Sequence, residues 1–241
     1  MKKTLTLFIA GAFCLPALNV NAGENGLSFK EKLEFAAPNA LRGSDGANGP
    51  GVIQIGLGWG ATLGGAKITS KYSTLTNVEN GVGINSNLGL RVQYGLADLF
   101  SAGIFVRREN AAYVTSDANS NSSTVGTNGF GFGLEAKIYP VNKEKFTLYA
   151  APRIGFSTSK TNFYGSNASN SIYGTANGLN YGFTAGFNWY WAKFIGMSLD
   201  LGYSGSALNG KFNDAILKDD TYKLNNGGFF IGFGLISRFG G

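Results

Sequence analysis

The amino-acid sequence predicts an all-β fold in which eight antiparallel strands close into an up-and-down barrel. Three observations predict it. Apolar residues alternate with small or polar residues in eight segments, and this period of two is typical of strands. The connections between the segments alternate between short and long, as in up-and-down barrels. Only 14% of the 241 residues are charged, while 44% are apolar and 37 residues are glycine.

Residues 1–22 have the features of a secretory signal peptide. Two lysines precede an apolar core, and small residues at Val20 and Ala22 indicate cleavage near Ala22. The apolar core is shorter than the roughly 20 residues that a transmembrane helix needs. The single cysteine, Cys14, lies in this segment. The sequence therefore predicts an exported mature chain that needs no disulfide.

Residues 23–50 are predicted to form an N-terminal segment and linker on the periplasmic side of the barrel. The stretch from Leu27 to Phe35 fits either a short amphipathic helix or a ninth strand. Gly43 to Gly51 has the composition of a flexible linker. Residues 51–241 are predicted to be the barrel domain.

The first three predicted strands are 52–67, 83–95 and 99–109. Each carries an apolar set at period two, although the alternation is less regular than in the strands that follow. The apolar sets are Ile53, Ile55, Leu57 and Trp59, then Ile84, Leu88, Leu90, Val92 and Tyr94, then Phe100, Ala102, Ile104 and Val106.

The fourth and fifth predicted strands are 128–139 and 146–158. In the fourth strand, every second residue is apolar from Phe130 to Ile138, and the residues between them are three glycines, Glu135 and Lys137. The fifth strand alternates less cleanly, through Phe146, Leu148, Ala150, Ile154 and Phe156.

The last three predicted strands are 179–190, 194–204 and 229–239. In the first of them, Leu179, Tyr181, Phe183, Ala185, Phe187 and Trp189 alternate with Asn, Gly and Thr residues. The next strand has Ile195, Met197, Leu199, Leu201 and Tyr203 at every second position. The final strand has Phe229, Ile231, Phe233 and Leu235, and ends at Phe239.

Many of these segments contain about 10 to 15 residues, whereas strands of soluble proteins usually contain about 5 or 6. A strand that crosses a bilayer needs about 9 to 11 residues. Short turns are predicted at 95–98, 140–145 and 191–193. Long polar loops are predicted at 68–82, 110–127, 159–178 and 205–226. Short periplasmic turns and long extracellular loops are typical of transmembrane barrels in the bacterial outer membrane.

Aromatic residues gather beside the predicted short turns. Amphipathic rings are enriched at the level of the lipid headgroups, so these residues are predicted to form the periplasmic aromatic girdle. They are Tyr94, Phe100, Tyr139, Phe146, Trp189, Trp191, Phe194 and Phe239.

Alternation alone fits two kinds of barrel. A soluble lipocalin-like barrel buries its apolar face, whereas a membrane barrel presents that face to lipid. The other face of this chain is mostly Gly, Ser, Asn and Thr, which lacks the charge of a water-exposed surface and suits a narrow interior. The sequence thus favours lipid on the apolar face, and lipid requires the barrel to be closed.

The pattern resembles the small outer-membrane β-barrel family of Gram-negative bacteria, the OmpA/OmpX-like barrels, over about residues 51–239. The final strand, 229–239, carries the resemblance most specifically. In that family a terminal aromatic residue on such a strand is read by the barrel-assembly machinery, so the resemblance implies this machinery as a partner. The chain departs from the pattern because Gly240 and Gly241 follow Phe239. Members of the family differ widely in task.

Eight charged residues share the predicted inward face. Five positive and three negative groups in a narrow barrel fit a structural network of ion pairs that fills the lumen. They also fit a weakly anion-favouring channel. The residues are Arg91, Arg107, Glu109, Glu135, Lys137, Arg153, Asp200 and Arg238.

Four further cations are predicted near the outer strand ends, Lys67, Lys71, Arg108 and Lys160. They could donate hydrogen bonds to lipopolysaccharide phosphates, or they could be ordinary solvated charges. The charges of the chain are scattered, with no run of Lys and Arg, so nucleic-acid binding is not predicted.

The sequence predicts no enzyme, cofactor or metal. It contains no histidine, which excludes imidazole as a catalytic base or as a metal ligand. A Ser–Lys pair or the acidic pair of Asp219 and Asp220 stays formally open as catalytic groups. Two functions from different classes follow. The first is a closed barrel with a structural or surface-interaction role through its loops, and the second is a small passive channel for polar or amphipathic solutes.

Overall fold

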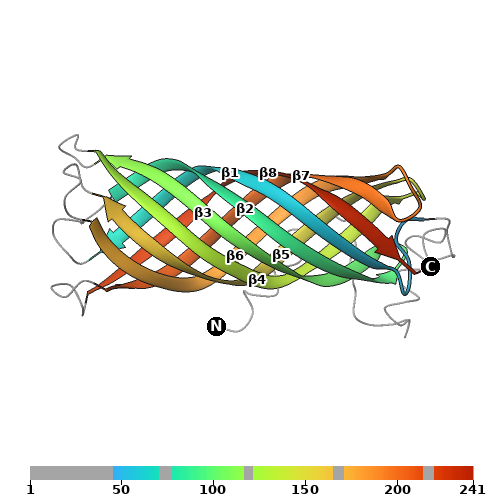
Figure 1. Cartoon of the computed structure of the whole chain (residues 1–241), viewed down its shortest axis with the longest axis horizontal. Coiled ribbons are helices and arrows are strands. Elements are labelled where there is room, and N and C mark those ends of the chain that lie inside the picture. The colour runs from blue at the N-terminus through green and yellow to red at the C-terminus, as the bar shows by residue number, and fades with distance from the viewer. Residues whose placement is uncertain (1–45, 71–77, 117–121, 165–170, 214–219, 241) are drawn as a thin grey trace, which may run out of the picture. The chain divides into compact units, whose positions relative to one another are not determined.

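A computed structural model describes residues 46–70, 78–116, 122–164, 171–213 and 220–240. Within these residues eight strands form one closed antiparallel barrel, in which each strand pairs with its neighbours in sequence and β1 pairs with β8 (Figure 1). The predicted fold class is therefore confirmed. The signal peptide, Lys71, Asp219 and most of the predicted N-terminal segment lie outside the described residues.

The strands contain 17 to 21 residues each. Their bounds are β1 Ile53–Ser70, β2 Val78–Ala97, β3 Phe100–Ser116, β4 Ser122–Asn142, β5 Phe146–Tyr164, β6 Ser171–Tyr190, β7 Ile195–Phe212 and β8 Thr221–Phe239. In the part of the chain that the structure describes, no helix is long and apolar enough to cross a membrane.

The strands extend well beyond their predicted ends, so the predicted loops are too long. Most of the segments 110–127, 159–178 and 205–226 continue the sheet. Tyr113 pairs with Val125, and Thr175 pairs with both Lys160 and Lys211. These segments are rich in Asn, Ser, Thr and Gly, which are typical of loops, but their backbone groups are satisfied by the neighbouring strands.

The barrel is taller than the apolar layer of a bilayer. Strands of this length extend about 60 Å along their own direction. At a tilt of about 40°, which is usual for such barrels, the wall is about 45 Å high, whereas the apolar band of an outer-membrane barrel is about 25 Å high. About half of each strand therefore lies beyond such a band. We call the part near the short turns the turn-end half, and the part formed by 64–70, 78–82, 110–116, 122–128, 157–164, 171–178, 204–212 and 221–228 the loop-end half.

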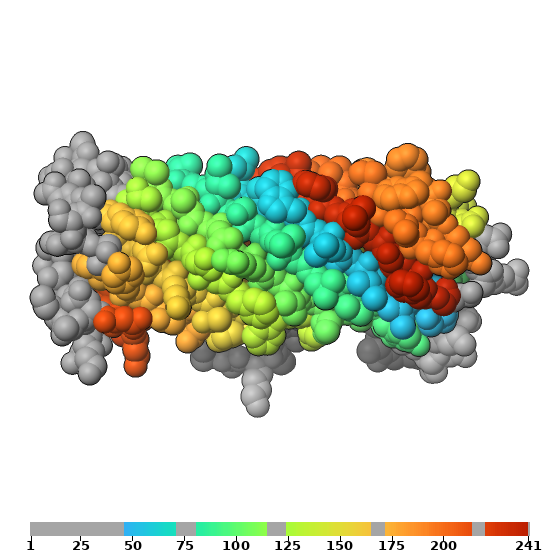
Figure 2. All heavy atoms as spheres, viewed as in Figure 1, coloured from blue at the N-terminus to red at the C-terminus, as the bar shows by residue number. Residues whose placement is uncertain are grey.

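The outward face of the turn-end half is an apolar belt that surrounds the barrel. Large apolar side chains on it are exposed on every strand, for example Leu57 at 54%, Leu134 at 63% and Phe233 at 55%. Adjacent strands bring these side chains into contact across the wall, as in the pair of Trp59 and Phe233, whose ring centroids lie 5.4 Å apart. Figure 2 shows this wall with β1 and β8 side by side.

Seven of the eight predicted girdle residues lie on the outside of the barrel near the turn end. Phe100 is half-buried there, and the other six are exposed, namely Tyr94, Phe146, Trp189, Trp191, Phe194 and Phe239. The prediction for Tyr139 is wrong, because its side chain is completely buried inside the barrel. Tyr139 follows Glu135 and Lys137 at period two, so its position in the strand, rather than its nearness to a turn, decides which face it takes.

The inward face of the loop-end half is apolar. Its buried apolar residues form one cluster, beside which a few small hydroxyl side chains such as Ser159 and Thr161 are also buried. The outward positions at this level are mostly polar. The cluster consists of Ala66, Ile68, Ala111, Tyr113, Val125, Phe163, Ala176, Leu208, Phe212, Tyr222 and Leu224.

Candidate functional site

The candidate site is the barrel interior, which is filled in successive layers from the turn end to the loop end. All eight charged residues predicted for the lumen lie inside the barrel. The exposed fraction is 2% or less for Glu135, Lys137 and Asp200. It is 6 to 9% for Arg107, Arg153 and Arg238. The side chains of Arg91 and Glu109 are exposed by 19% and 13%.

Residues 46–52 pack against the turn-end mouth through Asn48, which is buried. The Asn48 amide Nδ2 donates to the carbonyl oxygens of Ala97 at 2.8 Å and Asp98 at 3.2 Å. Asn142 Nδ2 donates to the Asn48 carbonyl oxygen at 2.7 Å, and the Asn48 backbone N–H donates to Asn142 Oδ1 at 3.0 Å. The prediction of a flexible linker up to Gly51 is therefore wrong from Asn48 onward, because these bonds fix the chain before β1.

A layer of neutral polar side chains follows. The Tyr139 hydroxyl donates to Gln54 Oε1 at 3.2 Å and lies 3.1 Å from the hydroxyl of Ser101. Ser101 in turn donates to Gln93 Oε1 at 3.2 Å, and Gln93 Nε2 donates to Glu135 Oε1 at 2.9 Å. A chain of hydrogen bonds therefore connects four strands, β1 to β4, and leads to the first of the charged groups.

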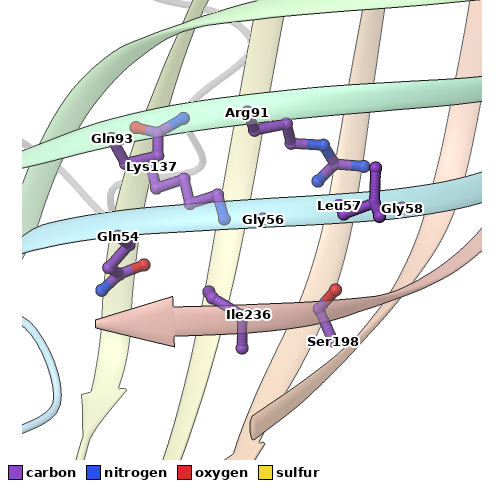
Figure 3. Close-up of a pocket in the computed structure, with 9 residues that line it drawn as sticks. All are labelled: Gln54, Gly56, Leu57, Gly58, Arg91, Gln93, Lys137, Ser198 and Ile236. Atoms are coloured by element: carbon purple, nitrogen blue, oxygen red, sulfur yellow. The ribbon is translucent and has the colours of Figure 1, made fainter. Parts of the chain in front are cut away.

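Asp200 is the centre of the charged layer. Arg91 Nη2 on β2 lies 2.8 Å from Asp200 Oδ2 on β7, so this ion pair crosses the barrel interior. The Tyr149 hydroxyl donates to Asp200 Oδ1 at 2.6 Å. Lys137 Nζ lies 4.2 Å from the centre of the Tyr149 ring, a cation–π distance. Figure 3 shows Arg91 and Lys137 beside the segment of β1 that contains Gly56 and Gly58.

Two arginines lie further toward the loop end. Arg107 pairs with Glu109, two residues along the same face of β3. The guanidinium carbon of Arg153 lies 4.8 Å from the centre of the Phe230 ring, another cation–π distance. Arg238 is separate from this group. It lies at the turn end, where its guanidinium covers the Tyr190 ring and Nε donates to the carbonyl oxygen of Lys193 at 2.7 Å.

Three aromatic rings, which we call the aromatic plug, fill the interior of the loop-end half. The centres of the Phe163 and Phe212 rings lie 5.5 Å apart, and that of Tyr222 lies 5.2 Å from Phe163 and 4.9 Å from Phe212. A Cβ atom at Gly174 would come within 2.6 Å of the Tyr222 ring. Glycine at this position therefore leaves the space that the plug needs.

The voids described between these layers are small. Two voids in the charged layer each have a volume of about 20 Å³. One is lined by Gln54, Arg91, Gln93 and Lys137 among others, and the second by Arg91, Arg107 and Arg153 among others. Each is large enough for about one water molecule and is far too small for an organic solute.

The predicted lipopolysaccharide contacts that the structure describes, Lys67, Arg108 and Lys160, are on the outward face on β1, β3 and β5. They surround the barrel rather than forming one patch. Lys211 and Lys223, which no pattern in the sequence singles out, are also exposed and line a groove of about 540 Å³ on β6 to β8. We call these five cations the basic ring.

Comparison with solved structures shows the class of fold. The outer membrane protein OprG from Pseudomonas aeruginosa matches with a TM-score of 0.55 and 15% identity, over 83% of this chain and all of that chain. Ail, the attachment invasion locus protein of Yersinia pestis, matches at a TM-score of 0.37 and 17% identity over 79% of this chain and 99% of that chain. Neisserial surface protein A matches at 0.37 and 12% identity, over 78% and 99% of the two chains.

The chain therefore has the fold of a small bacterial outer-membrane β-barrel, as the resemblance in its sequence implied. No family model matches it, and no curated protein matches it.

Proposed function

We propose that this protein is a closed barrel of the bacterial outer membrane with a structural or surface-interaction role. The apolar belt supports the location, since a wall of exposed Leu, Ile and Phe side chains is stable only when lipid covers it. The aromatic residues near the short turns suit the headgroup level on the periplasmic side. In this orientation the loop-end half projects outward from the cell.

One observation carries the proposal of a closed barrel. Side chains cross the described interior at three levels, with Asn48 at the mouth, the ion pair of Arg91 and Asp200 in the middle and the aromatic plug beyond it. A passive channel needs a continuous aqueous path. The voids of about 20 Å³ do not provide one.

The surface role belongs to the outward face of the loop-end half and to the connections at its rim. The basic ring supports an interaction with lipopolysaccharide phosphates, because exposed Lys and Arg donate charge-assisted hydrogen bonds to phosphate oxygens. Glu109, Glu135 and Asp200 lie inside the barrel, so these three carboxylates do not neutralise this outer face.

The proposal includes no catalysis. The chain contains no histidine, and the residues that the structure describes contain no group of three or more potential metal ligands. The acidic residues inside the barrel are engaged with arginines or a glutamine.

Planar-bilayer conductance of the refolded mature chain, residues 23–241, tests the proposal. Heat-modifiable mobility on a gel would first establish that the barrel is folded. A folded barrel should insert without discrete current steps. Steady openings in the absence of any ligand would overturn the closed barrel in favour of a small channel. A soluble monomer that does not enter bilayers would overturn the membrane location.

A further inference from the structure

The second void in the charged layer is surrounded by three guanidinium groups. Arg91 on β2, Arg107 on β3 and Arg153 on β5 line it, together with Asn87 and the neighbouring glycines Gly58 and Gly89. The two glycines are directly paired across β1 and β2, so no side chain from them fills this space. The volume of about 20 Å³ accepts one particle of about the size of a water molecule.

The charges around this void do not balance. Four cations occupy this part of the interior, Arg91, Arg107, Lys137 and Arg153, and three carboxylates accompany them. Asp200 pairs with Arg91, and Glu109 pairs with Arg107. The third carboxylate, Glu135, lies two residues from Lys137 on the same face of β4 and directly opposite Arg153 on β5. One carboxylate, Glu135, therefore serves both Lys137 and Arg153, and this layer has one excess positive charge.

Among the described residues no ion pair joins Arg153 to a carboxylate, although Glu135 lies opposite it on β4. Its side chain is 94% buried, as only 6% of the residue is exposed. One face of the guanidinium covers the Phe230 ring, and Nε lies against Gly182, where a Cβ atom would approach to 2.7 Å. Its Nε and Nη2 atoms have no hydrogen-bond partner in the protein, and neither has Nη1 of Arg107.

An arginine in such a position keeps its charge, because the guanidinium does not lose its proton in proteins. A buried charge is strongly unfavourable unless an opposite charge neutralises it. The donors that face the void are all N–H groups of cations or an amide, which suits an anion. The space has room for one atom and contains no second pocket for the oxygens of phosphate or sulfate.

We propose that this void binds a single halide ion, chloride under physiological conditions, between Arg153, Arg107 and Arg91. The bound ion neutralises the excess positive charge of the charged layer and is a structural component of the closed barrel. The inference concerns the interior only, so it does not depend on which partner the outer surface binds.

The test compares the thermal unfolding of the refolded mature chain in detergent in sodium chloride and in sodium gluconate at constant ionic strength. Gluconate is too large for the void. Above the Kd, each tenfold increase in chloride should multiply the folding equilibrium constant by about ten, because the ion binds only the folded barrel. Equal unfolding curves in the two salts would overturn the proposal.

A matched pair of variants assigns the effect to the void. Arg153→Met should abolish the difference between chloride and gluconate. Arg238 is a similarly buried cation at the turn end of the same barrel, and it does not line the void. Arg238→Met should therefore preserve the difference in unfolding between chloride and gluconate. A chloride response that persists in Arg153→Met would overturn the site.

Crystals of the unsubstituted protein grown in bromide provide a test that needs no variant. An anomalous-scattering peak should lie within contact distance of the Arg153 guanidinium. If the void shows no such peak, for example because Glu135 has turned toward Arg153, the proposal is wrong.

Discussion

The two halves of the barrel wall are built with opposite faces. In the turn-end half the apolar side chains point outward and the interior is polar and charged, as at Leu134 and Glu135. In the loop-end half the order is reversed, since Phe163 is buried inside and its neighbour Tyr164 is exposed. One continuous strand such as β5 contributes to both halves. The difference follows from the surroundings, because lipid favours an apolar exterior and water favours a polar exterior.

The same difference decides what stabilises each half. The interior of the turn-end half depends on hydrogen bonds and ion pairs, each of which must be complete. The interior of the loop-end half depends on apolar packing, as in a soluble protein. Four comparisons of variants test the contrast between the two halves.

The largest effect is expected for Asp200→Ala. The substitution leaves the buried Arg91 without its carboxylate and the Tyr149 hydroxyl without its acceptor. Breaking one side of a buried pair costs about 3 to 5 kcal/mol. Urea unfolding in lipid vesicles measures the loss. The double variant Arg91→Met with Asp200→Leu should recover most of it, and a double variant as unstable as Asp200→Ala would contradict this account.

Phe163→Ala should destabilise the barrel by about 3 kcal/mol, because it removes a packed ring from the aromatic plug. The matched control is Tyr164→Ala, the next residue on the opposite face, which is 42% exposed and should change stability by about 0.5 kcal/mol or less. Both are measured by urea unfolding. Equal losses would show that the loop-end half has no apolar core.

Leu134→Arg tests the outer faces and should cost about 2 to 4 kcal/mol, because it places a charge in the middle of the apolar belt. Asn209→Arg places the same charge on the outward face of the loop-end half, where water solvates it, and should have little effect. Unfolding in vesicles compares the two. A well-tolerated Leu134→Arg would argue against lipid at that position.

The smallest effect is expected for neutralising the basic ring. Replacing Lys160, Lys211 and Lys223 with Gln should weaken association with lipopolysaccharide-containing vesicles by about 1 kcal/mol or less for each lysine. Replacing Lys143 and Lys145, which are exposed at the turn end, should have no effect. Vesicle co-flotation at two salt concentrations measures the difference, and equal binding by both sets would exclude the ring as the contact.

The turn-end half was predictable from sequence because its alternation is strong. Phe130 to Ile138 and Leu179 to Trp189 show large side chains at every second position, and the structure places these strands as predicted. Tyr139 is the exception, because its nearness to a turn predicts an outward side chain whereas its position in the alternation places it inside the barrel.

The loop-end half was not predictable in the same way. Its inward positions include Ala176 and Gly174 as well as Leu208 and Phe212, so the apolar signal is diluted by small residues. Its outward positions are Asn, Thr and Lys, which are common in loops. The pairing of Arg91 with Asp200 was also hidden, because it depends on how strands distant in sequence face each other across the interior.

The pairing of β1 with β8 has a consequence for biosynthesis. Ile53 pairs with Phe239, and the register continues to Ser70 and Tyr222, so the strand made first must wait for the strand made last. Until the ribosome has completed β8, the edge of β1 has no partner, and lipid does not satisfy exposed backbone groups. A truncated product therefore has no stable state in the bilayer, and insertion itself selects for chains whose synthesis has been completed.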